Sequence, residues 1–178
     1  IPLIKKAGCW YISFGVESGN KEVLKFLRKD ITKEQAKEVI KKVSKAGIFT
    51  KGYFMLGNPT ESKDTIEETI KFAKSLRLDA AQFNLVLPIP YTEFEKVCME
   101  YGVFDSEDFD KMSGHSSDPV FVLDGMTKEY LKDIQKRAYK EFYGRPSYIF
   151  RQLLKIRDIN SFKKYAERGY TYLFNKSS

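Results

Sequence analysis

The sequence predicts an α/β fold in which three parallel strands are backed by helices and followed by a helical C-terminal extension. First, apolar strand-like segments alternate with amphipathic helical segments, an order that gives a parallel sheet. Second, the tripeptide Lys-Ala-Gly occurs at residues 6–8 and again at 45–47, each time directly before an apolar run. This pattern is typical of a helix that ends at a glycine cap and is followed by a strand. Third, the composition changes after about residue 103. We therefore divide the chain into two parts, 1–100 and 101–178.

The predicted strands and helices follow one another closely, so the first part of the chain is a β-α-β-α-β unit. In order, they are a strand over 9–17, helices over 20–46, a strand over 48–57, a helix over 62–76 and a strand over 80–87. Residues 1–7 look like the end of a helix that begins upstream, and the chain does not start with Met. We therefore expect a fragment of a longer protein.

Short polar motifs mark where predicted helices begin and end. Thr32 and Gln35 have the spacing of a capping box, in which side chains satisfy the first backbone N–H groups of a helix. Thr92 and Glu95 repeat that spacing. Gly102 is expected to end the helix that Thr92 begins.

The C-terminal part carries helix signals and no further strand of comparable clarity. Thr127 is expected to cap a helix that runs to Tyr143, with Gly144 at its end. Pro146 suits the start of another helix, because proline is tolerated in a first turn. Aromatic residues recur through this part, and at helical spacing they are expected to be core residues.

The composition is that of a soluble globular protein, with 42% hydrophobic and 31% charged residues among 178. No run approaches the roughly 20 consecutive apolar residues that a membrane span requires, and the N-terminus lacks a signal-peptide layout, so we expect a cytoplasmic protein without a membrane partner. The net charge is +7, but lysines alternate with glutamates as on solvated helix faces. A nucleic-acid partner is therefore not expected, and some basic charge could serve an anionic substrate.

Side chains that bind metals or act as nucleophiles are few. Cys9 and Cys98 are the only cysteines, far apart and without a CxxC partner, which disfavours a disulfide framework or a structural zinc site. We expect each to be a small buried hydrophobe and predict no metal ligand. His115, the single histidine, lies in a predicted solvent-exposed loop, and no Ser/His/Asp or paired-carboxylate pattern is supported.

The first strand has two different faces, because side chains alternate along a strand. The bulky face, expected to meet helices, holds Trp10, Ile12, Phe14 and Val16. The other face is small and polar and ends with Glu17 at the carboxyl end of the strand, where parallel α/β folds bind their ligands. Alternatively, Glu17 caps the helix that begins near Asn20.

Two further positions point to a ligand at the same edge. Gln82 and Asn84 share a face of the third strand, and polar residues in a parallel strand suggest a lumen that holds something polar. The alternative is that both amides bond to neighbouring strands or water. Gly57 allows a ligand close to the backbone, just before a helix N-terminus that favours an anion, although many ordinary turns share this pattern.

Three ordered segments, residues 15–19, 52–61 and 82–88, together resemble the second half of the radical S-adenosylmethionine (SAM) (βα)6 partial barrel. The resemblance covers residues 6–95. It implies an enzyme in which SAM and a [4Fe-4S] cluster sit at the carboxyl mouth of the barrel.

The resemblance also implies roles for individual residues. Glu17 would contact the SAM ribose, and Lys29 would be the basic partner of the methionine carboxylate. Val86 would line the adenine, and Tyr53 takes the place of an acidic ribose ligand found in some relatives. The full predicted cofactor-binding set is Glu17, Ser18, Lys29, Tyr53, Gly57, Gln82 and Val86. No catalytic residue is predicted.

The segment 139–149 resembles the C-terminal helical region of cobalamin-binding radical SAM enzymes, among them relatives of the anaerobic magnesium-protoporphyrin monomethyl ester cyclase. The chain has no CxxxCxxC segment, which in this family holds the cluster. The cluster-binding segment and a cobalamin domain are therefore expected upstream.

We thus expect the SAM-binding half of an oxidoreductase or methyltransferase that acts on a small molecule or tetrapyrrole, with cobalamin as a candidate cofactor. This chain alone is expected to be inactive. Its expected partners are the upstream half of the same protein and a small-molecule substrate, and the fragment could self-associate. One alternative is a tRNA-modifying radical SAM enzyme, favoured by the basic charge. The other is a non-catalytic interaction module built from half a barrel.

Overall fold

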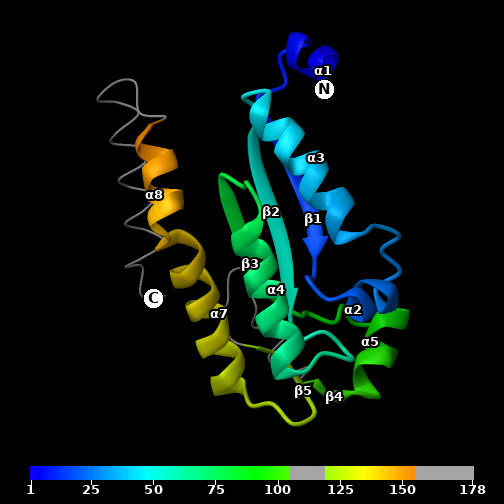
Figure 1. Ribbon diagram of the computed structural model, residues 1–178. Helices are drawn as coiled ribbons and strands as arrows, with labels where there is room; N and C mark the ends of the chain where they lie inside the picture. Colours follow the sequence, from blue (N-terminus) through cyan, green and yellow to red (C-terminus); the bar gives the residue numbers. More distant parts are fainter. Residues whose placement is uncertain (105–118, 155–178) are drawn as a thin grey trace.

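The computed structural model describes residues 1–104 and 119–154. The strands are β1 (Tyr11–Glu17), β2 (Phe49–Leu56), β3 (Ala80–Leu85), β4 (Gly102–Phe104) and β5 (Phe121–Leu123). The helices are α1 (Pro2–Lys6), α2 (Lys21–Phe26), α3 (Lys33–Lys45), α4 (Lys63–Ser75), α5 (Glu93–Met99), α7 (Lys128–Tyr143) and α8 (Pro146–Leu153). Strands β1, β2 and β3 form one parallel sheet in that order, with α3, α4 and α7 on one of its faces (Figure 1). The predicted α/β class and its three parallel strands are confirmed.

Most predicted helix starts agree with the structure because they depend on local hydrogen bonds. The Gln35 backbone N–H donates to Thr32 Oγ1 over 3.2 Å, and the Thr32 N–H donates to Gln35 Oε1 over 2.7 Å, which is a complete capping box. Thr127 likewise accepts from the Tyr130 N–H at the start of α7. The predicted cap positions of α3 and α7 are therefore confirmed.

Two expectations around α5 are wrong. The Glu95 N–H donates to Thr92 as expected, but the Glu95 carboxylate accepts from the Tyr91 N–H over 2.7 Å, so the box is not reciprocal. Gly102 does not end the helix, which stops at Met99. It lies in β4, where a Cβ would approach the Val122 carbonyl oxygen of β5 to 2.2 Å. The antiparallel partner strand, rather than a helix cap, requires this glycine.

The C-terminal part was expected to hold no further strand of comparable clarity, and the structure adds only the short antiparallel pair β4–β5. Strands of three residues are too short to show an alternating pattern. Trp10 is a further correction: it was expected to meet helices but is 73% exposed. It precedes β1, which lies at the edge of the sheet, whereas α3 and α4 pack on β2.

The main core lies between the sheet and the helices. Phe54 of β2 and Phe83 of β3 are both fully buried, with ring centroids 5.2 Å apart. Each contributes roughly 1.5–3 kcal/mol through burial. Residues of both predicted parts share this core, among them Ile40, Ile66, Ile70, Ala73, Ile134, Ala138 and Phe142. The division at residue 100 stays a prediction.

Side chains of α7 cover the free edge of β3. The Tyr143 hydroxyl accepts from the Ala81 N–H over 3.0 Å and donates to the Ala81 carbonyl over 2.9 Å. The Tyr139 hydroxyl makes the same two contacts with Phe83, at 3.1 and 3.3 Å. Tyr148 of α8 donates to the Asp79 carbonyl. These hydroxyls take the place of another strand and protect an edge that could otherwise pair with other chains.

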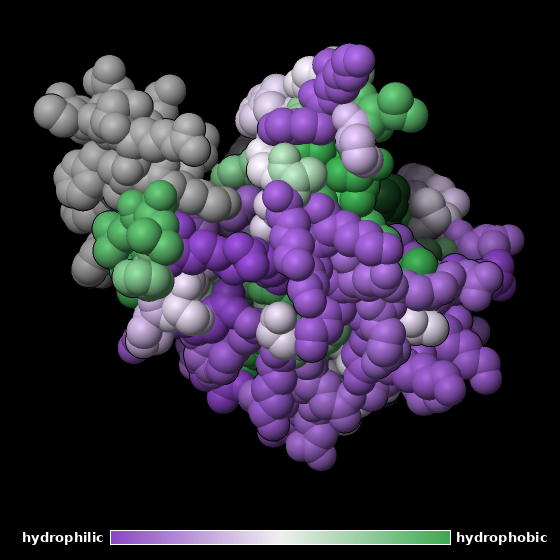
Figure 2. All heavy atoms as spheres, turned by 45° about the horizontal axis from the view of Figure 1, so that its top comes forward, coloured by the Kyte–Doolittle hydropathy of each residue, from purple (hydrophilic) through white to green (hydrophobic). Residues whose placement is uncertain are grey.

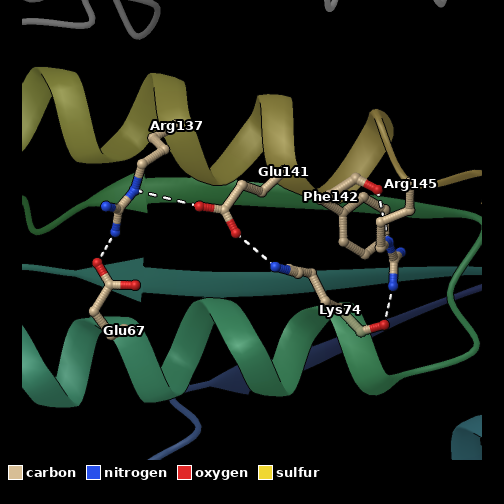
Figure 3. Close-up of polar contacts among 6 residues, drawn as sticks. All are labelled: Glu67, Lys74, Arg137, Glu141, Phe142 and Arg145. Carbon is tan, nitrogen blue, oxygen red and sulfur yellow. Dashed lines mark hydrogen bonds and ion pairs between the residues drawn. The ribbon is translucent and has the colours of Figure 1, made fainter.

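A polar network holds α7 against α4 (Figure 3). Glu141 accepts from Lys74 over 2.6 Å and pairs with Arg137, which also contacts Glu67. Arg145 donates to the carbonyl of Lys74. Because the paired side chains are about one third to one half exposed, the ion pairs orient the two helices more than they stabilise them.

The outer surface over the helices is largely hydrophilic, and hydrophobic residues gather at α8 (Figure 2). The exposed apolar residues of α8 and its C-cap are Ile149, Phe150, Leu153 and Leu154. In the described ranges, no helix has the length and hydrophobicity needed to cross a membrane.

Candidate functional site

The candidate site lies on the sheet face opposite the helices and at the carboxyl ends of β1, β2 and β3. Strands in a parallel sheet end at the same edge, so Glu17, Gly57 and Val86 come together there. This arrangement follows from the predicted strand order.

Glu17 forms an ion pair at the end of β1. Its Oε1 lies 3.2 Å from Lys29 Nζ, so two residues of the predicted set are in direct contact. The Glu17 backbone has φ 64°, and the register with β2 shifts between Gly15 and Glu17. Non-glycine residues seldom adopt this left-handed conformation, and they concentrate at functional sites. As a result, the Glu17 carboxylate lies over Gly15. A Cβ on Gly15 would lie 2.5 Å from Glu17 Oε1.

The alternative role of Glu17, as the cap of the next helix, is taken by another residue. The side-chain oxygen of Asn20 accepts from the backbone N–H groups of Glu22 and Val23, at 2.9 and 3.1 Å. Glu17 is therefore not needed to close this helix end, and its carboxylate faces Lys29.

Ser18 is fully buried and joins the end of β1 to α4. Its Oγ lies 2.9 Å from Thr69 Oγ1 and accepts from the Asn20 N–H. The Gly19 N–H donates to the same Thr69 hydroxyl over 3.0 Å. These contacts position the Glu17 turn, and a direct cofactor contact by Ser18 stays a prediction.

The turn after β2 is organised by Glu61, to which the sequence analysis assigned no role. Its Oε2 accepts from the backbone N–H groups of Gly57 and Asn58, each over 2.8 Å. The anion expected near Gly57 is thus supplied by the chain itself. Glu61 Oε1 and Asn58 Oδ1 are both buried, and neither has a hydrogen-bond partner among the described residues.

Burial raises the pKa of Glu61 from 4.5 to about 7, and the hydrogen bonds from Asn58 and Gly57 offset this rise only in part. A raised carboxyl pKa means that the folded chain binds the proton more tightly than the unfolded chain does. The stabilising effect is complete below about pH 4.5 and is lost as the pH rises through about 7.

The first prediction follows from this loss of stability as the pH rises. Glu61→Gln, which is neutral at every pH, should remove the pH dependence that comes from this site. Between pH 4.5 and about 7 the wild type should lose up to about 3 kcal/mol of unfolding free energy relative to the variant. Urea unfolding at several pH values measures this difference, and parallel pH profiles for the two proteins would contradict it.

The open face of the sheet carries a row of polar side chains. Lys51 Nζ donates to Gln82 Oε1 over 2.7 Å, and Gln82 Nε2 donates to Asn84 Oδ1 over 2.8 Å. The ammonium also lies 4.5 Å from the centroid of the Tyr53 ring. The predicted residues Tyr53 and Gln82 therefore share this face, and the alternative in which the amides bond to a neighbouring strand is observed for Gln82. Lys51, which links them, was not predicted.

Val86 lies apart from this row. Its side chain is buried in a second apolar cluster with Cys98 and Phe121, and its N–H donates to the Leu56 carbonyl. Its predicted contact with adenine stays a prediction. His115 lies outside the described residues.

Comparison with known proteins identifies the family of the first part of the chain. Residues 1–73 match the family model described as the radical SAM superfamily. This part of the chain belongs to the radical SAM superfamily. An uncharacterized methyltransferase of Pyrococcus horikoshii is 32% identical over 85% of the chain and 33% of its own length.

Other radical SAM relatives cover a similar part of the chain. An anaerobic magnesium-protoporphyrin IX monomethyl ester cyclase of Rubrivivax gelatinosus is 29% identical over 84% of the chain and 26% of the relative. A bacteriochlorophyllide d C-12(1)-methyltransferase of Chlorobaculum tepidum is 31% identical over 78% of the chain and 30% of the relative. The chain spans about a third or less of the length of these relatives.

The radical SAM cofactors fit the described residues unequally. The carboxylate of Glu17 and the ammonium of Lys29, at the carboxyl edge, suit the hydroxyl and carboxylate groups of SAM. The cysteines do not suit a cluster: Cys9 precedes β1, and Cys98 is buried on α5, where burial raises the pKa of its thiol to about 11. No group of three or more potential metal ligands occurs in residues 1–104 and 119–154.

Proposed function

We propose that this chain is the SAM-binding half of a radical SAM iron–sulfur enzyme, in which β1, β2 and β3 form half of a (βα)6 partial barrel. The observation that carries the proposal is the pair Glu17–Lys29 at the carboxyl end of β1, inside the segment that matches the family. The parallel order of the three strands supports the barrel geometry.

In this proposal Glu17 accepts hydrogen bonds from the ribose hydroxyls, and Lys29 binds the methionine carboxylate. The side chain of Glu17 is 16% exposed and that of Lys29 is 40% exposed, so both can reach a ligand without a large rearrangement. SAM supplies radical chemistry when it is bound beside the cluster, and the chain supplies binding and orientation. The thiolate ligands of the cluster come from an upstream segment.

The reaction is methyl transfer, which several relatives carry in their names, or oxidoreductase chemistry. It acts on a small molecule or tetrapyrrole, and cobalamin is a candidate further cofactor. Two named relatives act on magnesium-protoporphyrin and bacteriochlorophyllide compounds. The upstream half of the barrel completes the site, and the enzyme works in the cytoplasm.

The second prediction tests the ribose contact. Glu17→Gln should weaken SAM binding by roughly 1–3 kcal/mol, because a charge-assisted hydrogen bond becomes a neutral one. The melting temperature should change little, since Asn20 caps the following helix. Equilibrium dialysis with SAM, on the chain joined to its cluster-binding segment, measures the affinity.

Glu22→Gln is the matched control, because Glu22 is an exposed carboxylate in the first turn of α2, five residues away. It should leave SAM affinity unchanged. A Glu17→Gln variant that melts earlier and binds SAM as the wild type does would disprove the ribose contact.

A further inference from the structure

The open face of the sheet holds a cation, Lys51, that is fixed in place but has no carboxylate partner among residues 1–104 and 119–154. We propose that Lys51, Gln82 and Asn84 form a recognition site for one anionic oxygen group of the substrate, either a carboxylate or a phosphate. This inference rests on the proposed function, in which the open face is the substrate side of the barrel. It names a chemical class for the substrate.

The hydrogen bonds of the row run in one direction. An ammonium can only donate, so Lys51 fixes the oxygen of the Gln82 amide toward itself. The nitrogen of that amide then faces the Asn84 oxygen. The Asn84 amide nitrogen stands at the end of the row, with no hydrogen-bond acceptor recorded for it among the described residues. Lys51 and Asn84 are therefore donors at the two ends of one polarised row.

The charge of Lys51 is not neutralised within the described part of the chain. Lys29, Lys42 and Lys74 each lie within ion-pair distance of a glutamate, whereas Lys51 contacts the neutral Gln82 amide and the Tyr53 ring. Lys51 is half-buried, so water screens its charge less than on an open surface. A cation held in this way attracts an anion.

The neighbouring tyrosines add neutral donors to the same face. Tyr11 and Tyr53 lie on adjacent strands, with Tyr53 paired to Gly15 of β1 and to Gln82 of β3. Burial, together with Tyr53, raises the pKa of Tyr11. The Tyr11 phenol therefore stays protonated at neutral pH and interacts with the Tyr53 hydroxyl, so that one proton of this pair can be donated to an oxygen of the ligand.

The test titrates the ¹⁵N-labelled 178-residue chain with three probes of similar size: benzoate, phenyl phosphate and neutral benzamide. The side-chain amide signals of Gln82 and Asn84 report binding. At least one anion should give a saturable shift and bind on the order of tenfold more tightly than benzamide, the effect of one charge-assisted hydrogen bond. The tighter of the two anions identifies the group as a carboxylate or a phosphate.

Two variants test the role of the charge by different routes. Lys51→Met removes the ammonium, and Gln82→Glu places a carboxylate where the 2.7 Å contact now is, so that Lys51 is neutralised from within. Both should abolish binding of the anion, while Lys51→Arg should retain it. Lys42→Met on α3, which removes a paired lysine, is the control and should bind the anion as the wild type does.

The proposal is overturned if either charge-removing variant, shown to be folded by its amide spectrum, binds the anion like the wild type. It is also overturned if benzamide binds as tightly as the anions, or if none of the three probes gives a saturable shift. These probes do not contain SAM, and the substitutions leave Glu17 and Lys29 intact. Failure of this inference is therefore distinguishable from failure of the proposed SAM site.

Discussion

Gly19→Ala should destabilise the chain by about 3 kcal/mol, because there is no room for a methyl group where the end of β1 meets α4. A Cβ on Gly19 would lie 2.6 Å from Phe72 Cβ and 2.7 Å from the Glu68 carbonyl oxygen. Backbone atoms of a packed helix cannot shift individually at a low energetic cost, so the whole of α4 would have to move. The change would also disturb the contact between the Gly19 N–H and Thr69. Urea unfolding of the 178-residue chain measures the loss.

Gly15→Ala is the matched control in the same segment. Its Cβ would meet only the far ends of two flexible side chains, Glu17 Oε1 at 2.5 Å and Lys29 Nζ at 3.3 Å. These atoms can swing away, so the unfolding free energy should change by no more than about 0.5 kcal/mol. Equal losses for Gly15→Ala and Gly19→Ala would show that contact with α4 is not what requires Gly19.

The double substitution Tyr139→Phe with Tyr143→Phe should cost about 4 kcal/mol and make the chain self-associate. Each hydroxyl accepts a hydrogen bond from the N–H and donates one to the carbonyl of the same β3 residue. The Tyr139 hydroxyl bonds to Phe83, and the Tyr143 hydroxyl bonds to Ala81. Phenylalanine keeps the ring packing but leaves both backbone groups of Ala81 and the N–H of Phe83 without a partner, at roughly 1–3 kcal/mol for each site. The Phe83 carbonyl still accepts from Gln135 Nε2 over 2.8 Å. An uncovered strand edge then offers hydrogen bonds to another chain. Urea unfolding and sedimentation velocity measure the two effects.

Tyr130→Phe provides the control, because it removes a hydroxyl from the same helix at a place away from the β3 edge. No hydrogen bond to the Tyr130 hydroxyl is recorded within the described ranges. The variant should therefore unfold like the wild type and sediment like it under the same conditions. If the double variant had the same unfolding free energy and the same sedimentation behaviour as Tyr130→Phe, the role of the two hydroxyls at the β3 edge would be refuted.

Features that depend on neighbours in the chain could be predicted from the sequence. The capping box of Thr32 and Gln35 closes within four residues, so its hydrogen bonds need no distant partner. The alternation of strand-like and helical segments likewise predicted three parallel strands, because a helix between two strands lets the second strand run in the same direction as the first. The position of Glu17 at the carboxyl end of β1 follows from the same local pattern.

The partners of the site residues could not be predicted in this way. Ser18 looked like a small polar residue beside a ligand, and its hydroxyl is instead held by Thr69, 51 positions later in the chain. Glu61 looked like an acid at a helix start, and only the packing around the turn after β2 buries it and raises its pKa. Lys51 lies in a strand of mixed polarity, and its fixed contact with Gln82 comes from the neighbouring strand.

By itself the sequence determined the order of the three parallel strands and the helices between them, the caps of α3 and α7 and the strand end where Glu17 stands, because backbone dihedrals and capping hydrogen bonds are set within a few residues. Only the tertiary structure decided which polar groups are paired. It joined Glu17 to Lys29, covered the edge of β3 with Tyr139 and Tyr143, and left Lys51 without a described counter-ion. Burial and pairing arise between segments far apart in the chain, and they change the charge and hydrogen bonding of a residue without changing its local pattern.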